Sequence, residues 1–116
     1  MRAVSLASNS AMITAIANDL AYDQIYRKQL EHQLRAGDAV LLISASGSSP
    51  NVVEACHYAR KRGVPTIAFV GFGGGELAGL ADHVLHVPVE NYGLAEDVHQ
   101  AVMHMLSQYV AHMRRG

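Results

Sequence analysis

Short apolar runs alternate with segments of helical period along this chain. The runs at 39–44 and 65–70 are continuous, as expected for strands buried on both faces of a parallel sheet. Residues 83–87 predict a last strand, and residues 3–6 predict a short first strand. Strands that alternate with helices predict an α/β fold with a parallel sheet and right-handed crossovers.

Helix signals fill the intervals between these runs. Ser8 or Ser10 is expected to cap the first helix, and Asn18 with Asp19 to cap the second. Ser49 has the residue type of an N-cap and Pro50 suits the first helical position, while Gly63 marks the end of that helix. The predicted helices cover residues 10–17, about 21–34, 50–62, 76–79 and 94–113.

Length and composition limit the classes of protein to which this chain can belong. The chain has 116 residues, half of them apolar, which predicts one domain over residues 1–116 with a real core. Nine basic and ten acidic residues leave a net charge of -1, so no basic field favours nucleic acid. No apolar run is long enough to span a membrane. The single cysteine, Cys56, excludes an internal disulfide, is typical of the reducing cytoplasm, and is predicted to serve packing.

The segment from Ser44 to Asn51 carries the strongest chemical signal. An apolar strand runs into Ser44, Ser46, Ser48 and Ser49, and a helix opens at the following proline. Hydroxyl groups and the N–H groups of a helix N-terminus in one small volume can hold a phosphate. The alternative is a polar turn that merely caps the helix. In a parallel sheet, ligands bind at the carboxyl ends of the strands, where this segment lies.

A glycine-rich loop follows the next strand. Residues 73–78 fit the pattern G-x-G-x-x-A, but they open no long helix, and no acidic residue follows about 20 residues on at the end of a strand. We therefore expect no nucleotide cofactor, and we interpret the loop as a border of the ligand site.

The last helix has two dissimilar sides. Its apolar stripe is predicted to face the core and comprises Leu94, Val98, Val102, Met105 and Tyr109. The opposite side carries Glu96, Gln100, His104 and Ser107. Glu96 and His104 together could bind a divalent metal or move protons. The alternative is an ordinary solvated helix face.

Several segments together resemble the phosphoheptose (sedoheptulose 7-phosphate) isomerases, which belong to the sugar isomerase, or SIS, domain group. Residues 43–53 resemble the family segment I-S-T-S-G-N-S-x-N-V, and residues 14–19 resemble T-A-I-x-N-D. Residues 73–82 resemble the loop D-G-G-x-L-A-G-x-A-D, and residues 96–104 align with Q-E-x-H-x-x-x-x-H. The resemblance implies a three-layer α-β-α sandwich around a parallel sheet.

The resemblance also implies a function. Ser44, Ser46 and Ser49 would grip the phosphate of a sugar phosphate, and Asp19 would contact the substrate. His104 would be a metal ligand or a proton-transfer group, with Zn²⁺ as the expected metal. The family chemistry is an aldose–ketose isomerisation through an enediol. Relatives are usually cytoplasmic homotetramers with sites between subunits, so we expect a homo-oligomer.

The sequence also departs from the family pattern. Ala45 replaces the family threonine, and Glu96 replaces its glutamine. The family's N-terminal helices, first strand, G-N-G-G-S loop and remaining His and Glu ligands have no counterpart, so we expect the chain to correspond to a C-terminal portion. Two ligands are too few for Zn²⁺, which takes three or four from the protein. The alternative function is a non-catalytic module that binds a phosphosugar or another protein.

Overall fold

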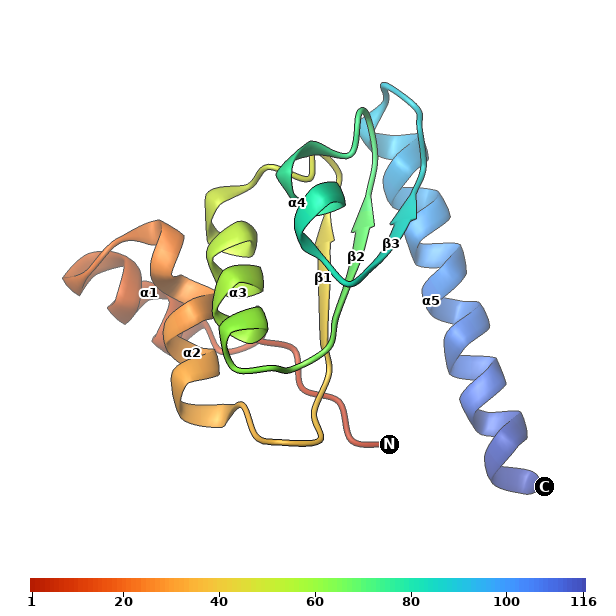
Figure 1. Ribbon diagram of the computed structural model, residues 1–116, viewed down its shortest axis with the longest axis horizontal. Coiled ribbons are helices and arrows are strands. Elements are labelled where there is room, and N and C mark those ends of the chain that lie inside the picture. Colours follow the sequence, from red (N-terminus) through yellow and green to blue (C-terminus); the bar gives the residue numbers. More distant parts are fainter.

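A parallel sheet of three strands forms the centre of the molecule in a computed structural model that describes residues 1–116 (Figure 1). The strands β1 (Val40–Ser44), β2 (Thr66–Val70) and β3 (His83–His86) lie side by side in chain order. The predicted α/β class is confirmed. The helices are α1 (Ser10–Asp19), the 3₁₀ helix η1 (Tyr22–Gln24), α2 (Ile25–Gln33), α3 (Pro50–Lys61), α4 (Gly75–Leu80) and α5 (Tyr92–Arg115).

The core lies between one face of the sheet and helix α3. Leu42 of β1 and Val70 of β2 pack in the same buried cluster as Val53 and Cys56 of α3. Helix α2 packs on α3, and α1 packs on α2, so these helices form the outer part of that layer (Figure 1). The Cys56 side chain is fully buried, and burial raises the pKa of its thiol. The predicted packing role of Cys56 is confirmed.

The second face of the sheet is only partly covered. Helix α5 lies on the side opposite α3 and α4, and it buries Ala95 and His99 (Figure 1). Leu41 and Ile43 of β1 point to this face and are 38% and 46% exposed. The prediction that β1 is buried on both faces is wrong, because α5 contacts the end of β2 and then runs past the sheet.

The predicted strand at residues 3–6 is also wrong, since residues 1–9 form no strand. Leu6 packs against the hydrophobic core, and its carbonyl oxygen accepts a hydrogen bond of 2.9 Å from the side-chain amide of Gln29. Leu6 is therefore apolar because it packs against the core, and the segment of residues 3–6 pairs with no strand.

The expected caps of the first two helices need correction. Asn9, not Ser8 or Ser10, caps α1, because its side chain accepts a hydrogen bond from the Met12 N–H. Asn18 and Asp19 form the last turn of α1 and cap no second helix. No side chain caps η1 or α2, so the second predicted helix begins as a 3₁₀ turn without a capping signal.

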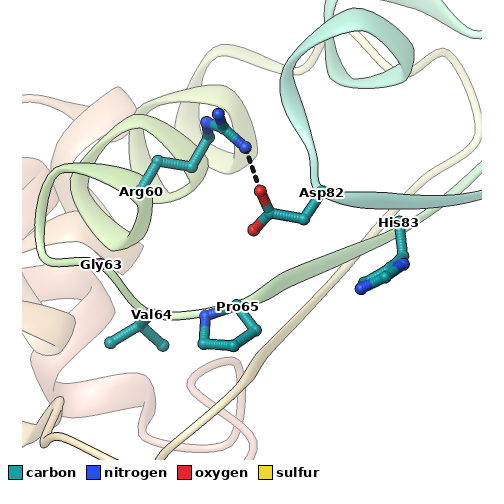
Figure 2. A pocket seen from close by; sticks show the side chains of 6 residues that line it. All are labelled: Arg60, Gly63, Val64, Pro65, Asp82 and His83. Atoms are coloured by element: carbon teal, nitrogen blue, oxygen red, sulfur yellow. Dashed lines mark hydrogen bonds and ion pairs between the residues drawn. The ribbon is translucent and has the colours of Figure 1, made fainter.

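Helix α3 has the bounds that its signals predict. It begins at Pro50, and Gly63 follows it with a φ of +69°. Its last turn is tied to the sheet by Arg60, which pairs with Asp82 (Figure 2). Asp82 also accepts hydrogen bonds of 2.9 Å from the N–H and the hydroxyl of Thr66. This cluster borders a shallow hollow at the amino ends of β2 and β3 (Figure 2), whereas Ser44 ends β1 at the opposite, carboxyl edge of the sheet.

The long helix α5 presents its apolar stripe differently from the prediction. Ala95 and His99 face the sheet, whereas Leu94, Val98, Met105 and Tyr109 are exposed. The predicted core-facing stripe is therefore mostly a surface stripe in this chain. None of the helices has the length and apolar character that crossing a membrane requires.

Candidate functional site

The serines converge where β1 ends and α3 begins. The Ser44 hydroxyl lies 3.1 Å from the Ser49 hydroxyl and 3.5 Å from the Ser46 hydroxyl. Gly47 N–H donates to the Ser44 hydroxyl, and Ser48 N–H donates to the Ser46 hydroxyl. Three of the four predicted hydroxyls thus lie together in one curved loop, residues 44–49, which we call the serine loop.

The serine loop and the first turn of α3 leave backbone donors without partners. Within the chain, the N–H groups of Ser46, Ser49 and Asn51 donate no hydrogen bond. Ser49 is the N-cap of α3, yet its side chain makes no capping bond and meets Ser44 instead. Unpaired N–H groups at the positive end of a helix dipole attract anions. The loop therefore has the donor set of an anion-binding site.

The glycine-rich loop packs directly on the serine loop. A Cβ atom on Gly47 would lie 2.0 Å from the Gly74 carbonyl oxygen, so only glycine allows this approach. Leu77 N–H donates to the Gly47 oxygen at 2.9 Å, and Glu76 N–H donates to the Ser48 hydroxyl at 3.3 Å. The Ser48 side chain is thus engaged with α4, unlike the other three serines.

A shallow hollow adjoins the start of α3. Residues of η1 form one wall, and the other wall is the helix start. Asp19 lies just before η1 at the end of α1, where it accepts a hydrogen bond from Asn18. Sequence reasoning missed η1 as part of this region, because nothing in residues 21–24 signals proximity to a helix 26 or more residues later. The lining residues are Ala21, Tyr22, Asp23, Ser49, Pro50 and Asn51.

The predicted metal or acid–base pair lies on α5. Glu96 and His104 are both exposed and are eight residues apart, or about 12 Å along the helix axis. The neighbour of His104 is Gln100, whose amide nitrogen is 3.4 Å from its Nε2. Nowhere in the chain do three or more His, Cys, Asp or Glu side chains group as a metal site requires. These residues alone therefore do not fit a zinc centre.

Helix α5 approaches the serine loop near its beginning, through Gly71, which lies between the two. A Cβ atom on Gly71 would lie 2.8 Å from the Ala95 Cβ and 3.0 Å from the Ala45 carbonyl oxygen. Glu96 is next to this contact, whereas His104 is nine residues beyond Ala95, or about 13 Å along the helix. His104 is therefore remote from the serine loop of its own chain.

The fold and the serine loop define an α/β domain with a loop rich in hydroxyl and free N–H groups at the carboxyl end of its sheet. The chain belongs to the SIS domain family, whose model matches residues 1–71. This match includes the serine loop.

Two curated proteins illustrate how similar this chain is to its relatives. The phosphoheptose isomerase of Nitratidesulfovibrio vulgaris strain Hildenborough is 43% identical over 110 residues, which cover 95% of this chain and 53% of that protein. The probable phosphoheptose isomerase of Thermoplasma acidophilum is 42% identical over 106 residues, or 91% and 58% of the two chains. The chain spans about half the length of the curated relatives it matches.

Solved structures agree with the sequence comparison. The phosphoheptose isomerase GmhA from Neisseria gonorrhoeae superimposes with a TM-score of 0.90 at 34% identity, covering 92% of this chain and 61% of that one. A phosphoheptose isomerase from Francisella tularensis gives 0.85 at 31% identity, covering 89% and 56%. The chain therefore has the fold of the matching part of these enzymes.

Proposed function

We propose that this chain is the phosphate-binding portion of a phosphosugar isomerase of the phosphoheptose isomerase type. The observation that carries the proposal is the serine loop with the first turn of α3, where three hydroxyls and three unpaired N–H groups lie close together. A phosphate ester carries the negative charge and the acceptor oxygens that such a donor set binds. The relatives named as phosphoheptose isomerases support a phosphoheptose as the substrate. Within that class we propose sedoheptulose 7-phosphate or a similar sugar phosphate.

The proposed reaction moves one proton between neighbouring carbons. A base removes the proton next to the sugar carbonyl while the carbonyl oxygen takes up a proton, which gives an enediol. An acid then returns a proton to the former carbonyl carbon as the neighbouring hydroxyl gives up its proton and becomes the new carbonyl. We assign the acid and base roles to His104 and Glu96. The phosphate is bound by the hydroxyls of Ser44, Ser46 and Ser49, at the end of the sugar remote from the reacting carbons. Asp19, at the end of α1, contacts the sugar.

We further propose a homo-oligomer whose sites lie between subunits, in the cytoplasm. The distance along α5 supports this arrangement, because His104 is too far from the serine loop of its own chain to act on a sugar bound there. A serine loop of one subunit and the polar side of α5 from another would then complete one site. Zn²⁺ would need donors in addition to Glu96 and His104, so we assign it no step.

The binding proposal is tested by NMR titration of the chain with sedoheptulose 7-phosphate and, in parallel, with unphosphorylated sedoheptulose. We expect the amide signals of Ser46, Ser49 and Asn51 to shift with the phosphate ester only. Ser49→Ala removes one donor and should weaken binding about threefold to tenfold. The matched control Ser5→Ala, in the exposed N-terminal segment, should bind like the wild type. Equal shifts with both sugars would contradict a phosphate site.

Turnover separates the isomerase from the alternative, a non-catalytic phosphosugar-binding or protein-interaction module. The module is favoured by one observation, namely that His104, to which we assign an acid or base role, is remote from the serine loop of its own chain. Conversion of sedoheptulose 7-phosphate by the intact protein that is lost in His104→Ala would support the isomerase. Binding by the intact protein without conversion would select the module.

A further inference from the structure

His99 is a buried imidazole for which the proposed function has no use. Its side chain is 2% exposed on the inner side of α5, and its ring lies 5.8 Å from the ring of Phe69, centroid to centroid. Its Nε2 is 2.9 Å from the Val70 carbonyl oxygen, and its Nδ1 has no hydrogen-bond partner. A carbonyl oxygen only accepts, so Nε2 carries the proton and Nδ1 presents a buried lone pair.

The peptide group that His99 contacts is shared by three segments. The Val70 oxygen also accepts a hydrogen bond of 2.9 Å from Val87 N–H, beyond the end of β3. The N–H of the same peptide, on Gly71, donates to the Ala45 oxygen of the serine loop at 2.7 Å. One peptide group therefore joins α5, the end of β3 and the serine loop.

A second peptide group continues the path. The Ala45 oxygen belongs to the Ala45–Ser46 peptide, which is trans because the chain has no cis peptide bonds. Its N–H, on Ser46, points away from the oxygen and is one of the unpaired donors of the serine loop. Successive hydrogen bonds thus run from the His99 ring through two peptide groups to a donor available for an anion. Hydrogen bonds in such a chain orient and polarise one another.

We propose that His99 is a positioning residue for anion binding, acting through the Val70–Gly71 and Ala45–Ser46 peptides to aim the Ser46 N–H into the phosphate site. The inference rests on the proposed function for the identity of the anion, a phosphate ester. The arrangement of the path itself rests only on the hydrogen bonds within this chain.

The substitutions His99→Gln and His99→Leu separate positioning from packing. The side-chain amide of glutamine can donate to the Val70 oxygen in place of Nε2, whereas leucine fills similar space without a donor. We expect H99L to shift the Gly71 and Ser46 amide NMR signals without ligand and to weaken sedoheptulose 7-phosphate binding about fivefold. H99Q should restore both properties to within about twofold. The matched control Phe69→Leu loosens the ring contact, keeps the hydrogen bond, and should leave the affinity unchanged.

Three results would overturn the proposal. The first is an Nδ1–H tautomer of His99 in the wild-type imidazole nitrogen spectrum, which is readable even if H99L fails to fold. The second is an H99Q variant that folds and binds no better than H99L. The third is an affinity loss in F69L equal to that in H99L, which would mean that His99 contributes only by packing. If the wild type binds no phosphate ester, the proposed function fails, while the tautomer and the Ser46 signal still decide the hydrogen-bonded path.

Discussion

At the scale of single residues, Asp82 shows how one carboxylate can hold three elements together. Hydrogen bonds from the N–H and the hydroxyl of Thr66 lower the pKa of its carboxyl, and Arg60 adds to the effect. Because the charged form is favoured in the folded state, this stabilisation is complete above the unfolded-state pKa of about 3.9. It is lost as the pH falls through the lower pKa of the folded state.

We therefore expect the stability of the wild type to fall more steeply below about pH 4 than that of Asp82→Asn. At neutral pH the variant should be the less stable of the two, because the amide cannot accept both Thr66 donors and pair with Arg60. Urea unfolding followed by circular dichroism from pH 7 to pH 2.5 measures both curves. Asp97→Asn, which removes an exposed carboxyl from α5, is the control. Parallel curves for the wild type and Asp82→Asn would refute this role for Asp82.

Local sequence predicts some site residues and conceals others. The serines next to the start of α3 were predictable, because an apolar strand, a hydroxyl-rich turn and a proline all lie within a dozen residues. The partner of the Ser48 hydroxyl was not, because Glu76 is 28 residues away and contributes its backbone N–H. The burial of His99 depends likewise on how α5 is rotated against β2, which no local pattern encodes.

At the scale of elements, the two loops that follow β1 and β2 act as one unit. Gly47 has a φ of +68°, and Gly74 and Gly75 also have positive φ values where the loops meet. A Cβ atom on Gly75 would lie 2.4 Å from the Ser46 oxygen, so both loops need glycine at their contact. The glycine-rich loop therefore fixes the conformation of the serine loop through these backbone contacts.

This contact predicts a large effect of Gly47→Ala. Its new Cβ would meet the Gly74 carbonyl, which is rigid backbone, in a conformation unfavourable to alanine. We expect a loss of stability of about 2 kcal/mol or more, together with loss of sedoheptulose 7-phosphate binding. Gly73→Ala is the matched control, since nothing lies within 4 Å of its added Cβ. Urea denaturation of both variants measures the difference, and equal stabilities would exclude the close contact.

Helix and strand positions followed from the sequence more reliably than the choice of packing faces. Strands β1 and β2 and helix α3 were predicted within two residues, because apolar runs, Pro50 and Gly63 are local signals. The stripe on α5 was assigned to the core because periodicity reveals which side chains share a face. It does not reveal which face meets the sheet, and the small residues Ala95 and Gly71 decide that in this chain.

At the scale of the whole molecule, two apolar surfaces lie uncovered. Leu41 and Ile43 are exposed on the sheet, and Met105 and Tyr109 are 62% and 61% exposed on α5. Apolar side chains exposed in this way favour association, and β1 has an unpaired edge as well. This surface supports the proposed homo-oligomer.

We expect the purified chain to self-associate on size-exclusion chromatography with light scattering. Met105→Glu places a charge within the apolar stripe of α5 and should shift the population towards the monomer at micromolar concentration. Gln33→Glu adds the same negative charge at an exposed position of α2, outside the apolar stripe, and should leave the oligomer intact. A wild-type chain that is monomeric at every concentration would contradict the proposed assembly.

The order of the strands has a consequence for how the chain acquires its structure. Each strand pairs with the one that precedes it, and the connecting helices α3 and α4 pack on the strands that they join. Every sheet pairing is therefore made between neighbouring parts of the sequence, which keeps the loops that must close during folding short. A growing chain can complete β1, α3 and β2 as a unit while β3 and α5 are still being synthesised.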